Sequence, residues 1–296
     1  MERKKASDFP PEVLKLFDGY IHGGLSRRDF LDRAAKYAVG GFTAVAMLEA
    51  LRPNFAWAEQ IPKNDPRITA DYQNYPSPRG SGNMRGYLAR PSKLSGKVPG
   101  IVVIHENRGV NPHIEDVARR LAVENYLAFA PDALTPLGGY QGDEQKDAAN
   151  YAKLDPAKRR EDMFAAVDFL KGRPEFSGKF GAVGFCAGGG VVNAMAVRFP
   201  DLAAAVPFYG DQPSAADAAK IKAPMLLHYA GEDNRINSGW PAFEAALKAA
   251  GVEYKAYVYP KTYHAFHNDT TPRYDEAAAK LAWARTLEFF KEHLKT

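Results

Sequence analysis

The sequence has one cysteine, a small net charge of +4 and no apolar run long enough to serve as a permanent membrane span. A single thiol cannot form an intrachain disulfide, and no second cysteine stands near it at a metal-binding or redox spacing. Basic residues are scattered among acidic ones, which excludes nucleic acid as an expected partner. The role of the lone thiol must therefore be judged from its neighbours.

What remains is the composition of an ordinary globular protein. The chain has 296 residues, of which 46% are hydrophobic and 25% are charged. These values argue against disorder and against a polytopic membrane protein. The length suffices for one large α/β domain with a well-buried core and an appendage.

The first 58 residues differ in sequence pattern from the rest, and the order of their features resembles a twin-arginine export signal. Ser26-Arg27-Arg28-Asp29-Phe30-Leu31 supplies paired arginines, residues 37–48 form a modest apolar run, and Ala56-Trp57-Ala58 offers small residues for a signal peptidase. This interpretation predicts a mature chain that starts near Glu59. It also predicts the twin-arginine translocase as a transient partner and a periplasmic or secreted location.

The alternative is that residues 10–50 form amphipathic helices that pack on the main domain or on a second subunit. Lys36 and Glu49 at the edges of the apolar run favour this alternative. The location would then be cytoplasmic. The predicted organisation is therefore a signal or helical arm over residues 1–58 and one catalytic domain over residues 59–296, assembled as a monomer or a homodimer.

From about residue 80, short apolar runs alternate with segments of helical periodicity. The predicted strands cover residues 84–89, 99–105, 127–130, 180–185, 203–208, 225–229 and 255–259. The predicted helices cover residues 114–125, 160–171, 188–199, 240–250 and 274–294. This alternation predicts an α/β fold with a mostly parallel, doubly wound sheet and helices on both faces. In such sheets, ligands bind at the carboxyl ends of the strands.

The lone cysteine lies in Gly184-Phe185-Cys186-Ala187-Gly188, between a predicted strand and a predicted helix. This is the nucleophile-elbow pattern, with sulfur in place of the usual serine oxygen. Small flanking residues are needed because the turn is tight, and the helix N-terminus favours thiolate over thiol. The alternative is a buried structural cysteine in a glycine-rich turn.

Two further residues follow strands downstream, in the order nucleophile, acid, histidine that this fold uses. Asp233 comes after the strand over 225–229, and His264 comes after the strand over 255–259. A histidine at this edge can act as general base, while an aspartate fixes its tautomer and stabilises the imidazolium. Three strand ends in this order make coincidence an unattractive explanation.

Neighbouring residues compete for these roles. Glu232 could take the place of the aspartate, and His267 lies one turn beyond the histidine. His228 falls in the middle of a strand and is expected to be a core histidine. His105 ends a strand beside the expected pocket and is assigned a supporting position.

Together these residues resemble the dienelactone hydrolase family, from about Gly86 to the C-terminus. The matching motifs are His105-Glu106-Asn107-Arg108-Gly109, Pro131-Asp132, Gly184-Phe185-Cys186-Ala187-Gly188-Gly189, Gly231-Glu232-Asp233 and His264-Ala265-Phe266. The resemblance implies an α/β-hydrolase fold and a catalytic triad formed by Cys186, His264 and Asp233. It implies hydrolysis of an ester or lactone through a thioester intermediate, with no metal and no cofactor.

The resemblance also implies roles around the triad. Glu106 would hold the resting thiol and take part in its activation when substrate arrives, and the backbone N–H groups of Asn107 and Ala187 would form the oxyanion hole. Without the resemblance, Glu106 could equally be an exposed loop carboxylate.

The substrate is less well defined by the sequence. Family members that act on dienelactone hold its carboxylate with arginines, one of them four residues after the triad histidine, where this chain has Asn268. Arg108, Arg235 or Arg273 could supply a substitute charge, although exposed arginines are common. A native dienelactone substrate is therefore not expected.

Three functions are compatible with this sequence. The first is a thiol esterase or lactonase, and the second is a non-catalytic member of the fold that binds a ligand or another subunit. The third is a redox protein that uses Cys186 as an oxidisable site. The intact elbow, acid and base argue against the second function, and the absence of a resolving cysteine argues against the third.

Overall fold

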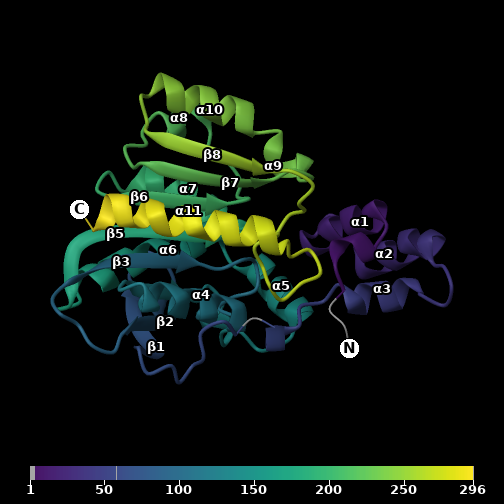
Figure 1. Cartoon of the computed structure of the whole chain (residues 1–296), viewed down its shortest axis with the longest axis horizontal. Coiled ribbons are helices and arrows are strands. Elements are labelled where there is room, and N and C mark those ends of the chain that lie inside the picture. Colours follow the sequence, from purple (N-terminus) through teal and green to yellow (C-terminus); the bar gives the residue numbers. More distant parts are fainter. Residues whose placement is uncertain (1–3, 58, 296) are drawn as a thin grey trace.

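The computed structural model describes residues 4–57 and 59–295, which form a helical arm and a larger α/β domain (Figure 1). The arm is residues 4–57, and its α-helices are α1 (Pro11–Ile21), α2 (Arg27–Ala34) and α3 (Ala44–Ala50). Short 3₁₀ turns accompany them at η1 (Ala6–Asp8), η2 (Ala35–Tyr37) and η3 (Phe55–Trp57). Among the described residues, none of the helices has both the length and the apolar character of a membrane span.

The sequence of the arm explains its helices. Ser26 caps α2 by accepting a hydrogen bond from the Asp29 backbone, and the Asp29 carboxylate returns a contact to the Ser26 backbone. Apolar side chains of all three helices form a small core, which includes Val13, Phe17, Phe30, Met47 and Leu48. The segment thus has the helical form that the arm alternative describes. Export and cleavage stay predictions, and Ala58 of the proposed cleavage motif lies outside the described residues.

In the described part of the chain, eight strands form one sheet with the order β1-β2-β4-β3-β5-β6-β7-β8. The strands are β1 (Ile68–Ser77), β2 (Gly82–Pro91), β3 (Val98–Ile104), β4 (Leu127–Pro131), β5 (Phe176–Phe185), β6 (Ala204–Phe208), β7 (Met225–Ala230) and β8 (Tyr254–Tyr259). Strand β2 is antiparallel to both of its neighbours, and all other pairs are parallel. The predicted mostly parallel sheet is therefore confirmed.

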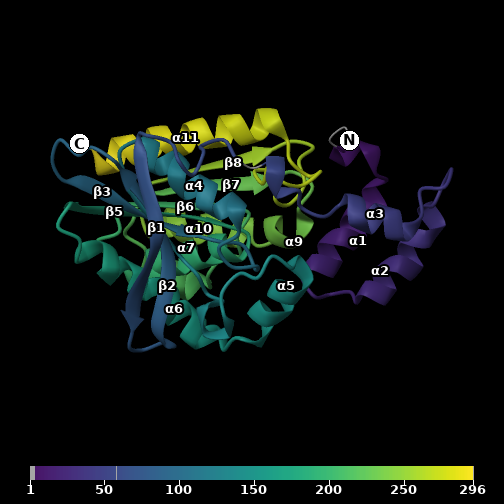
Figure 2. The same cartoon turned by 90° about the horizontal axis from the view of Figure 1, so that it is seen from below.

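Helices cover both faces of the sheet (Figure 2). They are α4 (Pro112–Val123), α5 (Glu144–Lys153), α6 (Pro156–Lys171), α7 (Ala187–Arg198), α8 (Ala215–Ala218), α9 (Asn234–Asn237), α10 (Trp240–Ala249) and α11 (Glu276–Leu294), with a 3₁₀ turn η4 (Thr135–Leu137). In β3, Ile101 and Val103 pack with α4 and α11, whereas Val102 and Ile104 pack with α6, α7 and α10. Because successive strand residues point to opposite faces, a strand covered on both sides is apolar throughout.

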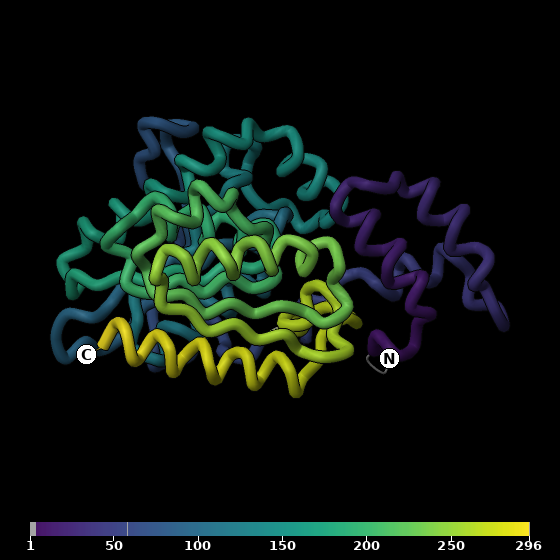
Figure 3. The backbone as a smooth tube through the Cα atoms, turned by 90° about the horizontal axis from the view of Figure 1, so that it is seen from above, coloured from purple at the N-terminus to yellow at the C-terminus, as the bar shows by residue number. Residues whose placement is uncertain are grey.

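The arm lies beyond the carboxyl ends of the parallel strands, beside α5 and α9 (Figures 1 and 2), and the backbone tube also shows it projecting from one end of the larger domain (Figure 3). This is the edge at which doubly wound sheets bind ligands.

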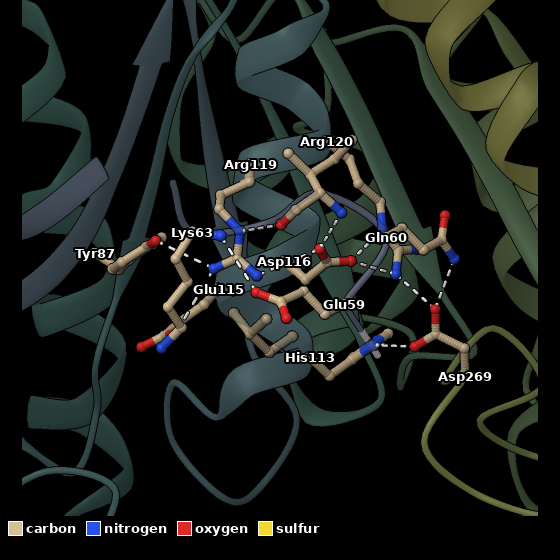
Figure 4. A network of polar contacts seen from close by, with 12 residues as sticks. Glu59, Gln60, Lys63, Tyr87, His113, Glu115, Asp116, Arg119, Arg120 and Asp269 are labelled. Carbon is tan, nitrogen blue, oxygen red and sulfur yellow. Dashed lines mark hydrogen bonds and ion pairs between the residues drawn. The ribbon is translucent and has the colours of Figure 1, made fainter. Parts of the chain in front are cut away.

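A network of charged side chains ties the segment that follows the arm to the domain (Figure 4). The Ile61 backbone N–H donates to Asp116 at 2.8 Å. Arg120 bridges Asp116 and Asp269, with distances of 2.5 and 2.6 Å. Asp269 belongs to the loop that follows His264. The network therefore joins three parts of the chain and fixes both the connection to the arm and the loop that carries the histidine.

Candidate active site

Cys186 stands at the turn between β5 and α7. Its backbone has φ 57° and ψ −118°, a strained conformation for a residue with a side chain. The Cys186 N–H donates to the Phe208 carbonyl at 3.1 Å and so fastens the turn to β6. This backbone is the one that a nucleophile elbow requires, and it places the sulfur at the N-terminus of a helix of 12 residues.

Two glycines make the turn possible. A Cβ atom on Gly184 would overlap the Gly188 carbonyl, and a Cβ atom on Gly188 would overlap the Ile104 carbonyl. Any larger residue at either position would push the helix away from the strands. The prediction that small residues are needed on both sides of Cys186 is confirmed.

His264 and Asp233 come together beside the sulfur. His264 Nδ1 lies 2.5 Å from Asp233 Oδ2, and the two side chains are only 4% and 2% exposed. A carboxylate only accepts hydrogen bonds, so His264 carries a proton on Nδ1, and Nε2 is the nitrogen left for proton transfer. A ring nitrogen of His264 lies within 4.8 Å of the Cys186 sulfur. The structure therefore brings the three predicted residues to one place.

The competing residues lie elsewhere. Glu232 is exposed, and the His267 ring is buried and stacks on Phe185 with ring centroids 5.0 Å apart. His228 is a core histidine, as predicted, with Nδ1 2.9 Å from the Tyr259 hydroxyl. Burial lowers the pKa of His228 to about 3, with the charge of Arg285 adding to the effect. None of these groups contacts Cys186 in the described chain.

A second histidine, which the sequence analysis did not single out, faces the sulfur from the arm. His22 Nε2 lies 3.4 Å from Cys186 Sγ. The His22 and His264 rings meet edge to face, with centroids 4.8 Å apart. On the other side of the His22 ring, Nδ1 contacts the Asp18 carbonyl oxygen at 2.8 Å and the Asp18 carboxylate at 3.3 Å. Cys186 thus has two imidazoles beside it, each supported by an aspartate.

These contacts favour an ionised sulfur. Burial raises the pKa of the Cys186 thiol, but the positive charges of His264 and His22 outweigh burial and lower it to about 6. For the two imidazoles the effect of burial is the reverse, because burial disfavours their positively charged form and lowers the pKa of each ring. The thiolate and the aspartates more than reverse this effect, so the pKa of His264 is about 10 and that of His22 about 9. Around neutral pH the site is therefore a thiolate beside two imidazolium ions.

Glu106 is buried, so the alternative of an exposed loop carboxylate is wrong. Glu106 is only 7% exposed, and its Oε2 accepts a hydrogen bond from Asn268 Nδ2 at 2.9 Å. No hydrogen bond joins Glu106 to the sulfur within the described residues. Asn268, which stands where the family has an arginine, therefore holds the carboxylate. His105 supports the loop that follows β4 by accepting from the Ala133 N–H at 3.1 Å.

The two amides assigned to the oxyanion hole are available. Neither the Asn107 nor the Ala187 backbone N–H donates a hydrogen bond to another group in the described part of the chain. Ala187 is the first residue of α7, where N–H groups have no partner within the helix. The Asn107 side chain donates to the Ile21 carbonyl of the arm at 3.0 Å.

The three arginines considered for substrate binding have partners within the protein. Arg108 Nε lies 2.5 Å from a Glu144 carboxylate oxygen, and Arg273 lies 3.7 Å from Asp18. Arg235 lies beside both imidazoles, with Nη2 3.4 Å from His264 Nδ1. Arg273 is only 6% exposed, so a simple surface role does not describe it.

A cavity of about 550 Å³ opens beside Cys186, a volume suited to a small organic ligand. The arm and the domain both contribute to its walls. Its lining includes Phe17, Tyr20, Ile21, His22 and Leu48 of the arm, and Asn107, Arg108, Tyr151, Ala187 and Ile236 of the domain. Three side chains as close as His22, Cys186 and His264 could also share a metal ion, an alternative that a chelator separates from nucleophilic chemistry.

Comparison with known proteins places this site in a family. Residues 84–294 match the model of the family described as "Dienelactone hydrolase family", and residues 1–36 match a second model described as "YqhI-like". A protein of Escherichia coli K12 named "Putative carboxymethylenebutenolidase" is 32% identical over 249 residues, which are 77% of this chain and 89% of that protein. "Protein usf" of Aquifex pyrophilus is 38% identical over 227 residues, 71% of this chain and 94% of its own length.

The solved structures agree in fold. A dienelactone hydrolase-like promiscuous phosphotriesterase from metagenomic libraries superposes with a TM-score of 0.68 at 26% identity, and the match covers 77% of this chain and 99% of that one. Nearly a quarter of the present chain therefore has no counterpart in that structure.

Proposed function

The chain belongs to the dienelactone hydrolase family, and we propose that it hydrolyses a carboxylic ester or lactone with Cys186 as the nucleophile. Membership in this family makes it a hydrolase. One observation carries the finer proposal, which is the convergence of the strained Cys186 turn with a His264–Asp233 pair at 2.5 Å. The backbone of Cys186 and the His264–Asp233 pair support a nucleophile that is activated by a base, with a carboxylate orienting that base.

The first half-reaction is acyl transfer to sulfur. The Cys186 thiolate attacks the acyl carbon, and the carbonyl oxygen, which becomes negative, accepts hydrogen bonds from the Asn107 and Ala187 N–H groups. As the tetrahedral intermediate collapses, the bond from the acyl carbon to the leaving oxygen breaks. His264 passes its proton to that oxygen and becomes neutral, which leaves a thioester on Cys186.

The second half-reaction is hydrolysis of the thioester. Neutral His264 takes a proton from water while the water oxygen attacks the acyl carbon. The carbon–sulfur bond then breaks, the carboxylic acid departs and Cys186 returns to the thiolate. Asp233 stabilises the imidazolium that forms on His264. The enzyme thus ends the cycle in its starting state, with a Cys186 thiolate and a protonated His264.

Glu106 and Arg108 have supporting roles in this proposal. Asn268 holds Glu106 in the resting structure, so Glu106 would take part in activation only for the fraction of Cys186 that is protonated. Arg108 lies in the cavity wall but is already paired with Glu144, so a substrate carboxylate would have to compete with that ion pair. The apolar side chains of Phe17, Ile21 and Leu48 favour an uncharged ester or lactone with an apolar substituent.

The direct test is hydrolysis of short p-nitrophenyl esters by the wild type, Cys186→Ala and Cys186→Ser. We expect Cys186→Ala to lower kcat by about 10⁴ or more in a protein that still unfolds cooperatively. EDTA is expected to leave the wild-type rate unchanged, because the mechanism uses no metal. Full activity of Cys186→Ala would assign the nucleophile to another residue. An inactive wild type that binds esters tightly would favour the non-catalytic alternative.

The cellular location and the assembly stay predictions. Export by the twin-arginine translocase to the periplasm or medium is predicted from residues 26–31, and it implies removal of the arm near Glu59. A monomer or a homodimer is predicted as the assembly. The mass of the mature chain and light scattering of the purified protein test the two predictions.

A further inference from the structure

The mechanism above uses one of the two imidazoles beside Cys186. The second belongs to His22, at the C-terminal end of α1, and its Nε2 lies 3.4 Å from the sulfur. The arm lies outside the residues that match the dienelactone hydrolase family, so this imidazole is an addition to the family's site. Its surroundings determine what it can do.

Local helix geometry orients His22. Asp18 precedes it by four residues, so the two side chains lie on the same face of the helix. The carbonyl oxygen of Asp18 only accepts hydrogen bonds, and at 2.8 Å it requires a proton on His22 Nδ1. Nε2 is therefore the nitrogen that faces Cys186. The negative end of the α1 dipole adds to the preference for a protonated ring.

The arm is held against the domain by polar contacts at the rim of the site. The Asn107 side chain donates to the Ile21 carbonyl at 3.0 Å, and Gln145 Nε2 lies 2.6 Å from the Tyr20 hydroxyl. Farther along, the Asn54 N–H donates to the Thr270 carbonyl at 2.7 Å. These contacts involve residues that precede and follow His22 in the sequence. Its position beside the sulfur is therefore fixed from several sides.

Charged groups from four elements face the His22 ring. Asp18 belongs to its own helix, Cys186 to the turn before α7, Arg235 to α9, and His264 to the loop between β8 and α11, which also carries Arg273, a partner of Asp18. Arg235 Nη2 lies 3.2 Å from His22 Nε2, and because a guanidinium only donates hydrogen bonds, this contact and its positive charge both oppose a proton on Nε2. Asp18 lies 3.7 Å from both arginines and offsets this repulsion. Asp211 also pairs with Arg235, at 3.5 Å.

We propose that the arm is a working part of the active site and that His22 is a second catalytic imidazole, which holds the Cys186 thiolate while His264 transfers protons. This inference rests on the proposed function of Cys186, and it requires a chain that keeps the arm, so it competes with the cleavage near Glu59 that the export prediction implies. In the resting enzyme His22 donates its Nε2 proton in a hydrogen bond to the thiolate. During turnover only the His264 proton moves, first to the leaving oxygen and then back from water. His22 keeps its proton and stabilises the sulfur anion before attack and when the thioester breaks.

The test measures the sulfur directly. The full-length wild type, His22→Ala, His22→Gln, Asp18→Asn and the control His293→Ala are alkylated with iodoacetamide from pH 4.5 to 9.5, and kcat is measured on a p-nitrophenyl ester. His293 is a matched control because it is a partly buried histidine on α11, outside the site. Melting temperatures of all the proteins are recorded.

In the wild type and His293→Ala, the alkylation rate is expected to rise with a midpoint near pH 6. In His22→Ala and His22→Gln the midpoint is expected to move toward the ordinary thiol value of about 8.5, so that alkylation at pH 6 falls about fivefold for the first unit of the shift and about tenfold for each further unit. The kcat is expected to fall by about tenfold, with KM less affected. Asp18→Asn should move the midpoint in the same direction by less.

Unchanged midpoints and unchanged kcat in folded His22→Ala and His22→Gln would overturn the proposal. If the alanine variant does not fold, the glutamine and asparagine variants decide, because both keep a polar side chain of similar size. The alkylation profile does not require turnover. A wild type without esterase activity would thus contradict the proposed function, whereas a midpoint that ignores His22 would contradict only the role of the arm.

Discussion

The helical arm and the α/β domain each present an aspartate–histidine pair to the same sulfur, but they hold these pairs by different means. In the domain, Asp233 and His264 are 31 residues apart and come from two loops at strand ends, with side chains 2% and 4% exposed. In the arm, Asp18 and His22 are neighbours on one helix, 25% and 18% exposed. The first pair depends on the sheet, whereas the second depends on helix geometry and on docking of the arm.

The cores differ in the same way. The sheet has apolar clusters on both faces, whereas the arm has one small cluster of its own. Small units bury a smaller fraction of their surface and are correspondingly less stable. We therefore expect substitutions in the domain to cause large losses of activity and stability, and substitutions in the arm to cause smaller ones. The following predictions test this difference in order of the expected effect.

The largest contrast is between the two carboxylates. Asp233→Asn is expected to lower kcat by about 10³ to 10⁴, because the amide favours the wrong tautomer of a base that must exchange protons. Asp18→Asn is expected to lower kcat by about tenfold or less, because His22 keeps its contact with the Asp18 carbonyl. Steady-state rates on one p-nitrophenyl ester provide the comparison. Equal losses would show that the two pairs share the proton transfers.

Stability gives a second contrast, between two glycines. Gly188→Ala is expected to cost about 3 kcal/mol or to prevent folding, because its Cβ would meet the Ile104 carbonyl. Gly23 has φ +79° with open space around it, so Gly23→Ala is expected to cost about 1 kcal/mol for the backbone alone. Urea unfolding of both variants measures these costs. A larger cost at Gly23 would mean that the arm contributes more to stability than its core suggests.

The pH dependence separates the two histidines. The thiolate forms as the pH rises through about 6, so activity should rise there. On the alkaline side His22 loses its proton near pH 9 and His264 near pH 10, so activity should fall in a small step and then completely. A profile of kcat/KM from pH 5 to 11 shows both limbs, and His22→Ala should lack the smaller step. A single alkaline limb in both proteins would contradict the assignment.

The same titrations both stabilise the fold, but their contributions depend on pH in opposite directions. Cys186 has a folded-state pKa below its usual value of about 8.5, so its contribution is complete above that value and is lost as the pH falls through about 6. The folded-state pKa of His264 is raised, so its contribution is complete below about 6.5 and is lost as the pH rises through about 10. Together the two contributions stabilise the fold most between about pH 6.5 and about pH 8.5.

The smallest effect is expected for a hydrogen bond at the contact surface between the arm and the domain. Tyr20→Phe removes the hydrogen bond to Gln145 and is expected to weaken docking by about 1 kcal/mol, whereas Tyr37→Phe, on the same arm, should have little effect. Limited proteolysis measures the difference as faster cleavage between arm and domain in Tyr20→Phe. Equal cleavage rates would indicate that apolar contacts alone hold this contact surface together.

Much of the domain could be predicted from the sequence. Buried strands such as β3 and β5 are apolar throughout, and Cys186, Asp233 and His264 each follow a strand in the order of a known fold. Strand β1 was missed because it is a largely exposed edge strand with polar residues such as Asp71 and Gln73. Helix α5 was missed because few of its residues are apolar. Neither element has the periodicity that identified the others.

The arm was harder to predict, for two physical reasons. Ser26-Arg27-Arg28-Asp29 fits an export signal and also a helix capping box, because serine at the N-cap and aspartate three residues later satisfy the first turn. The four-residue spacing of Asp18 and His22 could have indicated a paired histidine on a helix. No local pattern, however, says that this helix docks at the far edge of a sheet, because that contact joins residues 164 positions apart.

The most direct test of the joint site is the intact mass of the active protein isolated from cells that produce it naturally, after alkylation of its single cysteine. An arm that completes the site predicts a labelled chain that still includes residues 4–57, with esterase activity before labelling. A fully active chain that begins near Glu59 and carries the same label would contradict it, and would establish that the sulfur works with His264 alone.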